Sequence, residues 1–193
     1  MALTRAQRRR QIEVDQIAMA IGVDHWNIED LEDEARIPVL EVMKNQLIRG
    51  EIVMQYTLID EHLTIAICDY FFRRRNPKRT YRQLWRTKRF RIFNHHIMDE
   101  TNLLPKMRIV HEIAPIPGHI TERIRRIDVL RNEVAHSFFP ENRKAHMPKK
   151  ARLYRGSDIF TKEGVDKFIE DCSAVSGYLI HRLYGIEPEQ TEA

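Results

Sequence analysis

Four side chains that can handle protons or anions stand close together between positions 130 and 140, namely Arg131, Asn132, His136 and Ser137. A histidine whose pKa is about 6.5 can accept or release a proton at neutral pH. The planar guanidinium of arginine binds carboxylates and phosphates through paired N–H donors, and an asparagine amide can orient either partner. These residue types at this spacing indicate proton transfer on an anionic substrate.

The segment that carries these residues is predicted to be a helix from about His119 to Phe139, ended by Pro140. Its apolar residues recur three or four positions apart: Ile120, Ile124, Ile127, Leu130, Val134 and Phe138. Arg131 falls within this apolar stripe, whereas Asn132 and His136 share a more polar face. Because an unpaired buried charge is costly, we expect an anion to meet Arg131. It is either a carboxylate from a facing helix or the phosphate of a ligand.

A long helix is predicted from Pro38 to about Phe72, with an apolar face made by Ile52, Val53, Tyr56, Ile59, Leu63, Ile67 and Tyr70. Midway along it stand Asp60, Glu61 and His62. A carboxylate beside an apolar stripe is a natural partner for an arginine on a facing helix, so we favour Glu61 or Asp60 over His62 as the partner of Arg131. The alternative is that these are ordinary charges facing solvent.

Residues 73 to 91 contain eight arginines, two lysines and no acidic residue. Asn76 and Pro77 interrupt the preceding helix, and Thr80 is predicted to cap a new one along which Arg82, Arg86 and Arg89 line one face. Charges this dense repel one another unless an anion lies nearby, and nucleic-acid phosphate fits that role. The alternatives are a solvent-exposed face, or docking against the acidic segment 24–34. Lys149 and Lys150, in a predicted loop over 140–158, can flank the same substrate.

The remaining segments complete an all-α prediction. We expect a helix from Ile92 to about Val110 with a break near Pro105, a turn at 115–118, and a last amphipathic helix from Thr161 to Gly185. Together they predict an antiparallel bundle of four to five helices over residues 37–186. A charged, helical N-terminal extension covers residues 1–36, and residues 187–193 form a disordered tail.

Composition limits the function classes. The 193 residues suit one domain with a sizeable core, and the net charge is +4. Two cysteines make no disulfide framework or zinc site, and adjacent His95 and His96 point about 100° apart on a helix, so no metal or other cofactor is expected. No apolar run is long enough to span a membrane, and no signal peptide is visible, so we expect a cytoplasmic protein.

Arg131, Asn132 and His136, with Ser137 after them, resemble the R-x(4–6)-H motif of the HEPN superfamily of ribonucleases. The resemblance extends over residues 38–186 through the order of the helices. It implies a HEPN-like bundle and a metal-independent endoribonuclease that acts on RNA as a homodimer, in toxin–antitoxin systems or phage defence, with an antitoxin or other protein as partner. Arg131, Asn132 and His136 are then catalytic, and Asp60, Glu61 and Ser137 support them.

Two points from the residues qualify that resemblance. Arg131 and His136 project about 140° apart on an ideal helix, which a two-fold dimer can overcome by bringing opposed helices to one cleft. The alternative function is a non-catalytic HEPN-like module that binds nucleic acid or a protein, in which Arg131 serves the fold.

Overall fold

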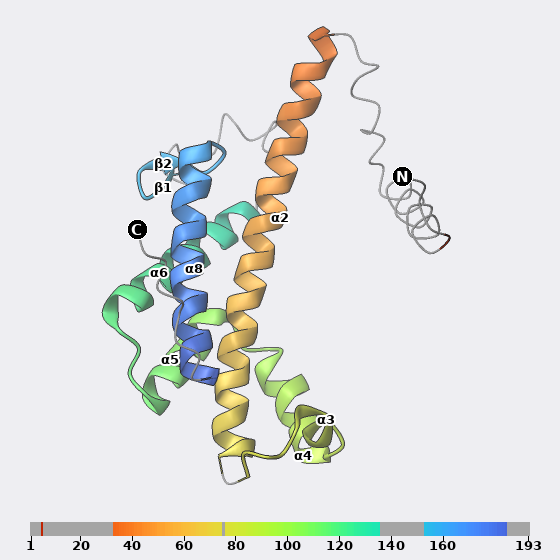
Figure 1. Cartoon of the computed structure of the whole chain (residues 1–193), viewed down its shortest axis with the longest axis vertical. Helices are drawn as coiled ribbons and strands as arrows, with labels where there is room; N and C mark the ends of the chain where they lie inside the picture. The colour runs from red at the N-terminus through yellow and green to blue at the C-terminus, as the bar shows by residue number, and fades with distance from the viewer. Residues whose placement is uncertain (1–4, 6–32, 75, 136–152, 185–193) are drawn as a thin grey trace. The chain divides into compact units, whose positions relative to one another are not determined.

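The computed structural model describes residues 5, 33–74, 76–135 and 153–184 of the chain, and these are mostly helical (Figure 1). The all-α class predicted from the sequence is confirmed at this level. The chain divides into two units, residues 1–47 and 48–193, and the boundary falls inside the long helix α2 (Asp33–Cys68). The predicted tail and almost all of the predicted extension lie outside the described residues. The core and the candidate site both belong to the second unit.

The helix α2 begins at Asp33 rather than at the predicted Pro38, and it continues past Cys68 into a π-helical turn, η2 (Asp69–Arg73). Acidic residues favour a helix N-terminus, which is consistent with the earlier start. From residue 48 onward its core face carries Ile52, Ile59, Leu63 and Ile67, all fully buried. Two residues predicted for that face, Val53 and Tyr70, are instead 45% and 37% exposed.

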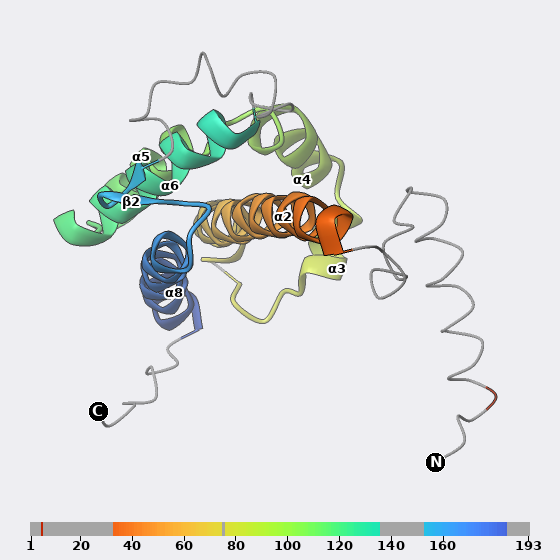
Figure 2. The same cartoon turned by 90° about the horizontal axis from the view of Figure 1, so that it is seen from above.

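The helices α5 (Leu103–Ile113), α6 (Gly118–Ala135) and α8 (Lys162–Tyr184) complete the core. The predicted stripe of α6 is confirmed from Ile120 to Val134, and α8 buries Phe168, Cys172, Val175 and Leu179. Figure 1 shows α6 running opposite to α8 and to the part of α2 from residue 48 onward, while that part of α2 and α8 point the same way. Seen from above, α6 and α8 flank this part of α2 on one side, with α3 and α4 on the other (Figure 2).

The basic segment folds into short helices rather than one. Thr80 caps α3 (Tyr81–Trp85) through a capping box with Gln83, as predicted, but α3 ends after five residues. A second short helix, α4 (Lys88–Phe93), leads into the π-helical turn η3 (Asn94–Met98). The prediction that Arg82, Arg86 and Arg89 share one helical face is therefore wrong, because the chain turns at Arg86.

The predicted helix over 92–110 is also divided, and its break lies at residues 99–102, before Pro105. Pro105 stands in the first turn of α5, where a helix tolerates proline because the N–H it lacks would be unpaired there anyway. In place of the predicted turn at 115–118, a short irregular connection at 114–117 joins α5 to α6, which already begins at Gly118. His111 helps to hold this connection, since the backbone N–H of Ile116 donates to His111 Nδ1 at 3.1 Å.

The end of the predicted 140–158 loop is a β-hairpin, formed by β1 (Leu153–Tyr154) and β2 (Ser157–Asp158). Its two turn residues, Arg155 and Gly156, have φ of 48° and 84°, as a tight two-residue hairpin turn requires. Gly164 at the start of α8 lets this hairpin approach, because a Cβ at that position would clash with the backbone of Asp158.

Among the helices of the described residues, none is both long and apolar enough to cross a bilayer.

Candidate functional site

A groove of about 680 Å³ opens between α2, the α3–η3 segment, the start of α5 and the end of α6. Three of the residues singled out from the sequence line it: Arg131 from α6, and Asp60 and Glu61 from α2. Aromatic side chains from three elements add to its wall, Tyr56 from α2, Tyr81 and Trp85 from α3, and Phe90 from α4. Its volume suits a nucleotide-sized ligand, since pockets for small organic ligands span about 300–1,000 Å³.

Arg131 is half-buried at the edge of this groove. Its guanidinium lies over the ring of Tyr56, 4.7 Å from the ring centroid, and its Nη1 donates to Asn132 Oδ1 at 3.0 Å. Asn132 Nδ2 in turn donates to Asp128 Oδ2 at 3.3 Å. The amide of Asn132 therefore links the guanidinium of Arg131 to the carboxylate of Asp128, one helical turn away. The R-x4-H spacing alone does not predict this link.

Asp128 is buried, and burial raises the pKa of its carboxyl, while the charge of Arg131 and the Tyr56 hydroxyl act in the opposite direction. Burial also raises the pKa of Tyr56, with the Asp128 charge as the second cause. Arg131, Tyr56 and Asp128 thus form one electrostatic group, of which Arg131 and Tyr56 line the groove.

The carboxylate expected to meet Arg131 pairs elsewhere. Asp60 Oδ2 accepts a hydrogen bond from Lys106 Nζ at 2.6 Å, and the Lys106 side chain is only 4% exposed. No ion pair between described residues joins Arg131 to Asp60 or Glu61, so the predicted pairing is wrong. The cation that most needs a partner is the buried Lys106, because a desolvated ammonium is far costlier than a guanidinium half-open to water.

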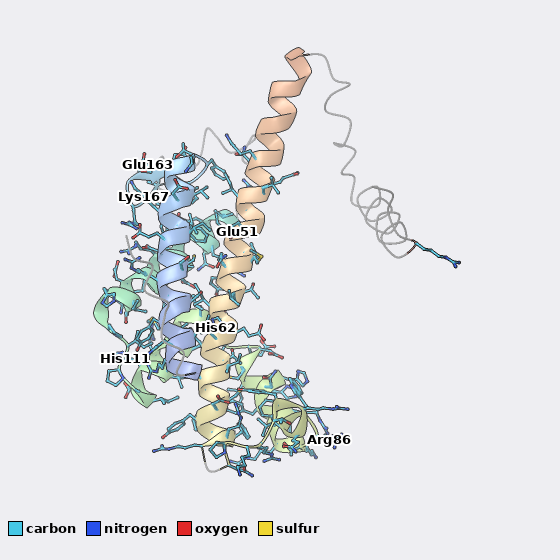
Figure 3. The ribbon with its side chains drawn as sticks, viewed as in Figure 1. Glu51, His62, Arg86, His111, Glu163 and Lys167 are labelled. Atoms are coloured by element: carbon cyan, nitrogen blue, oxygen red, sulfur yellow. The ribbon has the colours of Figure 1, made fainter. Side chains whose placement is uncertain are left out.

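Glu61 is exposed on the groove wall, whereas His62 is buried among the core residues. Burial lowers the pKa of His62, and its Nδ1 has no hydrogen-bond partner among the described residues. Figure 3 shows His62 toward the C-terminal end of α2. A neutral imidazole packed in the core is the consistent reading, and it agrees with the preference for the carboxylates over this histidine.

His136, Ser137, Lys149 and Lys150 lie outside the described residues. The relative geometry of Arg131 and His136, and the contribution of the two lysines, therefore stay predictions.

The basic segment contributes to the groove only through Tyr81, Trp85 and Phe90, because Arg82 and Arg86 do not line it and Arg89 lines a different pocket. Figure 3 shows Arg86 on the α3–α4 segment, at the opposite end of α8 from Glu163 and Lys167. Neither Arg82, Arg86 nor Arg89 forms an ion pair with a described carboxylate. Trp85 is 40% exposed, so part of its ring faces the groove.

Within the described part of the chain, no group of three histidine, cysteine or acidic residues is placed to hold a metal ion. His95 lies 3.1 Å from Asp99, an exposed contact one helical turn apart. The two cysteines, Cys68 and Cys172, are buried and free, and burial raises the pKa of each thiol to about 12, so neither is a ready nucleophile.

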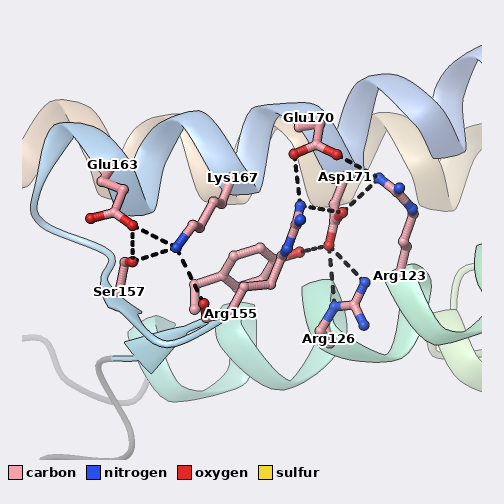
Figure 4. A network of polar contacts seen from close by, with 9 residues as sticks. Arg123, Arg126, Arg155, Ser157, Glu163, Lys167, Glu170 and Asp171 are labelled. Atoms are coloured by element: carbon pink, nitrogen blue, oxygen red, sulfur yellow. Dashed lines mark hydrogen bonds and ion pairs between the residues drawn. The ribbon is translucent and has the colours of Figure 1, made fainter.

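A second polar cluster, centred on Asp171, was missed in the sequence (Figure 4). This carboxylate is fully buried on α8 and accepts from Arg123, Arg126, Arg155 and the Tyr154 hydroxyl, at 2.7–3.2 Å. A signal was present: Phe168, Asp171, Cys172 and Val175 follow core spacing, so an acid occupies a position that the helix buries. The cluster joins α6, α8 and the hairpin, and its donors are directed at protein.

Comparison of the chain with models of known protein families, with curated proteins and with solved structures found no match in any of the three.

Proposed function

We propose that this protein is a metal-independent endoribonuclease of the HEPN type, built on a HEPN-like helical bundle and acting on RNA as a homodimer. The observation that carries the proposal is the position of Arg131. The arginine of the R-x4-H motif lines a groove of nucleotide size, beside partly exposed aromatic rings, instead of being enclosed in the core.

The contacts of Arg131 leave it suited to hold a phosphate. Stacking on Tyr56 uses the face of the guanidinium, whereas the N–H donors radiate in its plane. Among the described residues, only Nη1 donates to a protein oxygen, the Asn132 amide. The remaining donors can bind the oxygens of a phosphodiester and oppose the charge that develops on them in the transition state.

The reaction we propose uses the 2′-hydroxyl of RNA as the nucleophile. His136 takes the proton from that hydroxyl as its oxygen bonds to phosphorus. The bond from phosphorus to the 5′-oxygen of the next nucleotide breaks, and that oxygen takes a proton from the protonated His136 of the second copy or from water. The products are a 2′,3′-cyclic phosphate and a 5′-hydroxyl. A second copy of the chain supplies the opposed Arg131 and His136 where one copy cannot bring both to the same phosphate. Arg82, Arg86, Arg89, Lys149 and Lys150 hold flanking phosphates of the RNA.

The test is cleavage of single-stranded and structured RNAs by the purified full-length chain in the presence of EDTA. We expect Arg131→Ala and His136→Ala each to lower the rate by about 100-fold or more while the far-UV circular dichroism is retained. Arg125→Ala is the matched control, since Arg125 is exposed on the same helix outside the groove, and it should cleave as the wild type does. An inactive wild-type dimer, or cleavage undiminished in both variants, contradicts the proposal.

The second candidate is a non-catalytic HEPN-like module that binds RNA or a regulatory protein such as an antitoxin. One observation favours it: Arg131 is already held by Tyr56 and Asn132, as a structural residue would be. In that case Arg131→Ala lowers the free energy of unfolding, His136→Ala does not, and neither variant changes RNA cleavage because the wild type has none.

A further inference from the structure

A second pocket, of about 610 Å³, lies between η2, the loop after it and the start of α4. Three consecutive aromatic residues, Tyr70, Phe71 and Phe72, form an aromatic wall, and Arg74, Arg79 and Arg89 also line the pocket. Among the residues that the structure describes, no acidic side chain lines it, and none of its lining residues also lines the Arg131 groove.

The aromatic wall is both open and held in place. Phe71 is 56% exposed and Tyr70 is 37% exposed, and their rings meet edge to face with centroids 5.2 Å apart. Phe93 supports the wall from behind, 5.7 Å from Phe71 and 5.1 Å from Phe72. An exposed ring fixed by its neighbours offers a π-face on which any nucleobase can stack.

The arginines of the pocket differ from their neighbour Arg73. The Arg73 guanidinium donates hydrogen bonds to the Asp69 carboxylate and to the backbone carbonyls of Pro77 and Arg79. Arg74 and Arg89 instead lie over Tyr70 and Phe72, 5.1 and 5.8 Å from the ring centroids. Stacking leaves their N–H groups free in the guanidinium plane, and neither forms an ion pair with a described carboxylate.

Three guanidinium groups around one cavity repel one another, so an anion that enters it relieves that repulsion. A ligand that combines a flat aromatic ring with a phosphate can stack on the exposed ring of Phe71 and place its phosphate among the three arginines. A simple anion leaves the exposed rings of Tyr70 and Phe71 unused, and an acidic peptide offers carboxylates without a base to stack.

We propose that this pocket, the Phe71 pocket, binds one nucleotide unit, with its base stacked on the exposed ring of Phe71 and its phosphate held by Arg74, Arg79 and Arg89. The nucleotide is either a free mononucleotide or one unit of a single strand. The site does not depend on cleavage at Arg131, so it can exist whether or not the protein is a ribonuclease.

The test is isothermal titration calorimetry of the full-length chain with adenosine 5′-monophosphate and with a short oligodeoxyadenylate. The deoxy strand has no 2′-hydroxyl and cannot be cleaved by the proposed reaction, so binding is separated from catalysis. We expect Phe71→Leu to weaken binding by about tenfold, because it keeps an apolar contact but removes the stacking face. Ile92→Val, at an exposed apolar residue of α4 outside the pocket, should bind as the wild type does.

A second pair of variants tests the phosphate. Arg89→Gln should weaken binding of both ligands by about tenfold, as the loss of a charge-assisted contact does, whereas Arg108→Gln, at an exposed arginine of α5 that lines neither pocket, should leave binding of both ligands unchanged. Sensitivity of the mononucleotide to both Phe71→Leu and Arg89→Gln identifies a free nucleotide as the ligand. The same sensitivity seen only with the oligonucleotide identifies a unit of a strand.

Three results overturn the proposal: neither ligand binds, Phe71→Leu binds as tightly as the wild type, or inorganic phosphate or polyglutamate competes as effectively as the nucleotide. Loss of RNA cleavage in Arg131→Ala with nucleotide binding intact supports both proposals, whereas loss of both cleavage and nucleotide binding in Arg131→Ala rejects the pocket alone.

Discussion

The helix α6 uses its arginines in two different ways, and the difference separates the fold from the candidate site. In its first half, Arg123 and Arg126 direct their N–H donors at the buried carboxylate of Asp171 on α8 (Figure 4). Near its end, Arg131 lies with its face on the ring of Tyr56 and donates only from Nη1 among the described contacts. One end of the helix therefore has its charges compensated by protein, and the other keeps donors for a ligand.

These arginines are better distinguished by their contacts than by their burial. All three side chains are partly buried, so exposure does not separate them. What differs is which part of the guanidinium is used, since a carboxylate occupies the in-plane donors and an aromatic ring occupies only the face. An arginine held by a ring is fixed in position and still able to bind an anion.

The largest expected effect on the free energy of unfolding concerns Asp171. Asp171→Ala should lower the free energy of unfolding by about 3–5 kcal/mol, because it leaves Arg123, Arg126 and the Tyr154 hydroxyl without the acceptor around which they are packed. Urea denaturation followed by circular dichroism measures it. If Asp171→Ala were as stable as the wild type, the first half of α6 would not be the structural half.

The matched control is Glu170→Ala. Glu170 pairs with Arg155 at 2.8 Å and with Arg123 at 3.6 Å, but its side chain is 55% exposed. A solvent-exposed ion pair contributes about 0–1 kcal/mol, so this variant should lie close to the wild type. A large loss there would mean that the network depends on total charge rather than on the buried acceptor.

Much of the helical framework can be predicted from sequence periodicity. The stripe from Ile120 to Val134, the cap at Thr80 and the break between helices before Gly118 were predicted from local patterns, because each depends on neighbours within a few positions. The hairpin at 153–158 was not. Its turn places Arg155, a non-glycine residue, at a positive φ, and the contact of Arg155 with Glu170 and Asp171 that accompanies this conformation comes from a distant helix.

Three of the predicted site residues, Arg131, Asp60 and Glu61, line one groove, whereas Asn132, Arg82, Arg86 and Arg89 do not. The requirement that a buried cation meet a carboxylate applies to Lys106 rather than to Arg131. Lys106 shares the helical spacing of the core residues Leu103 and Met107, so its burial can be predicted from the sequence. Which carboxylate it takes cannot be predicted, because that choice depends on how α5 crosses α2.

The next-largest expected effect on stability concerns the contact between the Arg131 guanidinium, near the end of α6, and the ring of Tyr56. In a double-mutant cycle of Tyr56→Leu and Arg131→Met, we expect a coupling free energy of about 0.5–2 kcal/mol, the range of a cation over an aromatic face. Urea denaturation of the four proteins provides it. Additive effects of the two substitutions would show that the ring does not hold the guanidinium, and the proposed distinction between the two halves would fail.

The smallest expected effect is a dependence on pH that originates from Asp128. Burial raises the pKa of this carboxyl above its usual value of 3.8, so the folded protein binds a proton there more readily than the unfolded chain does. The contribution to stability is therefore greatest at low pH and is lost as the pH rises through the folded-state pKa. Asp128→Asn cannot titrate, so the free energy of unfolding of the wild type minus that of Asp128→Asn should decrease as the pH rises above 3.8.

Arg131 provides a way to sharpen that measurement. The charge of Arg131 lowers the pKa of Asp128 against the effect of burial, so Arg131→Met should raise the pKa further and extend the decrease to higher pH. Denaturation of wild type, Asp128→Asn, Arg131→Met and the double variant across this pH range tests it. A profile that is unchanged by Arg131→Met would mean that the guanidinium does not act on the carboxylate. The link from Arg131 through Asn132 to Asp128 would then have no electrostatic consequence, and Arg131 would have to be judged by its contact with Tyr56 alone.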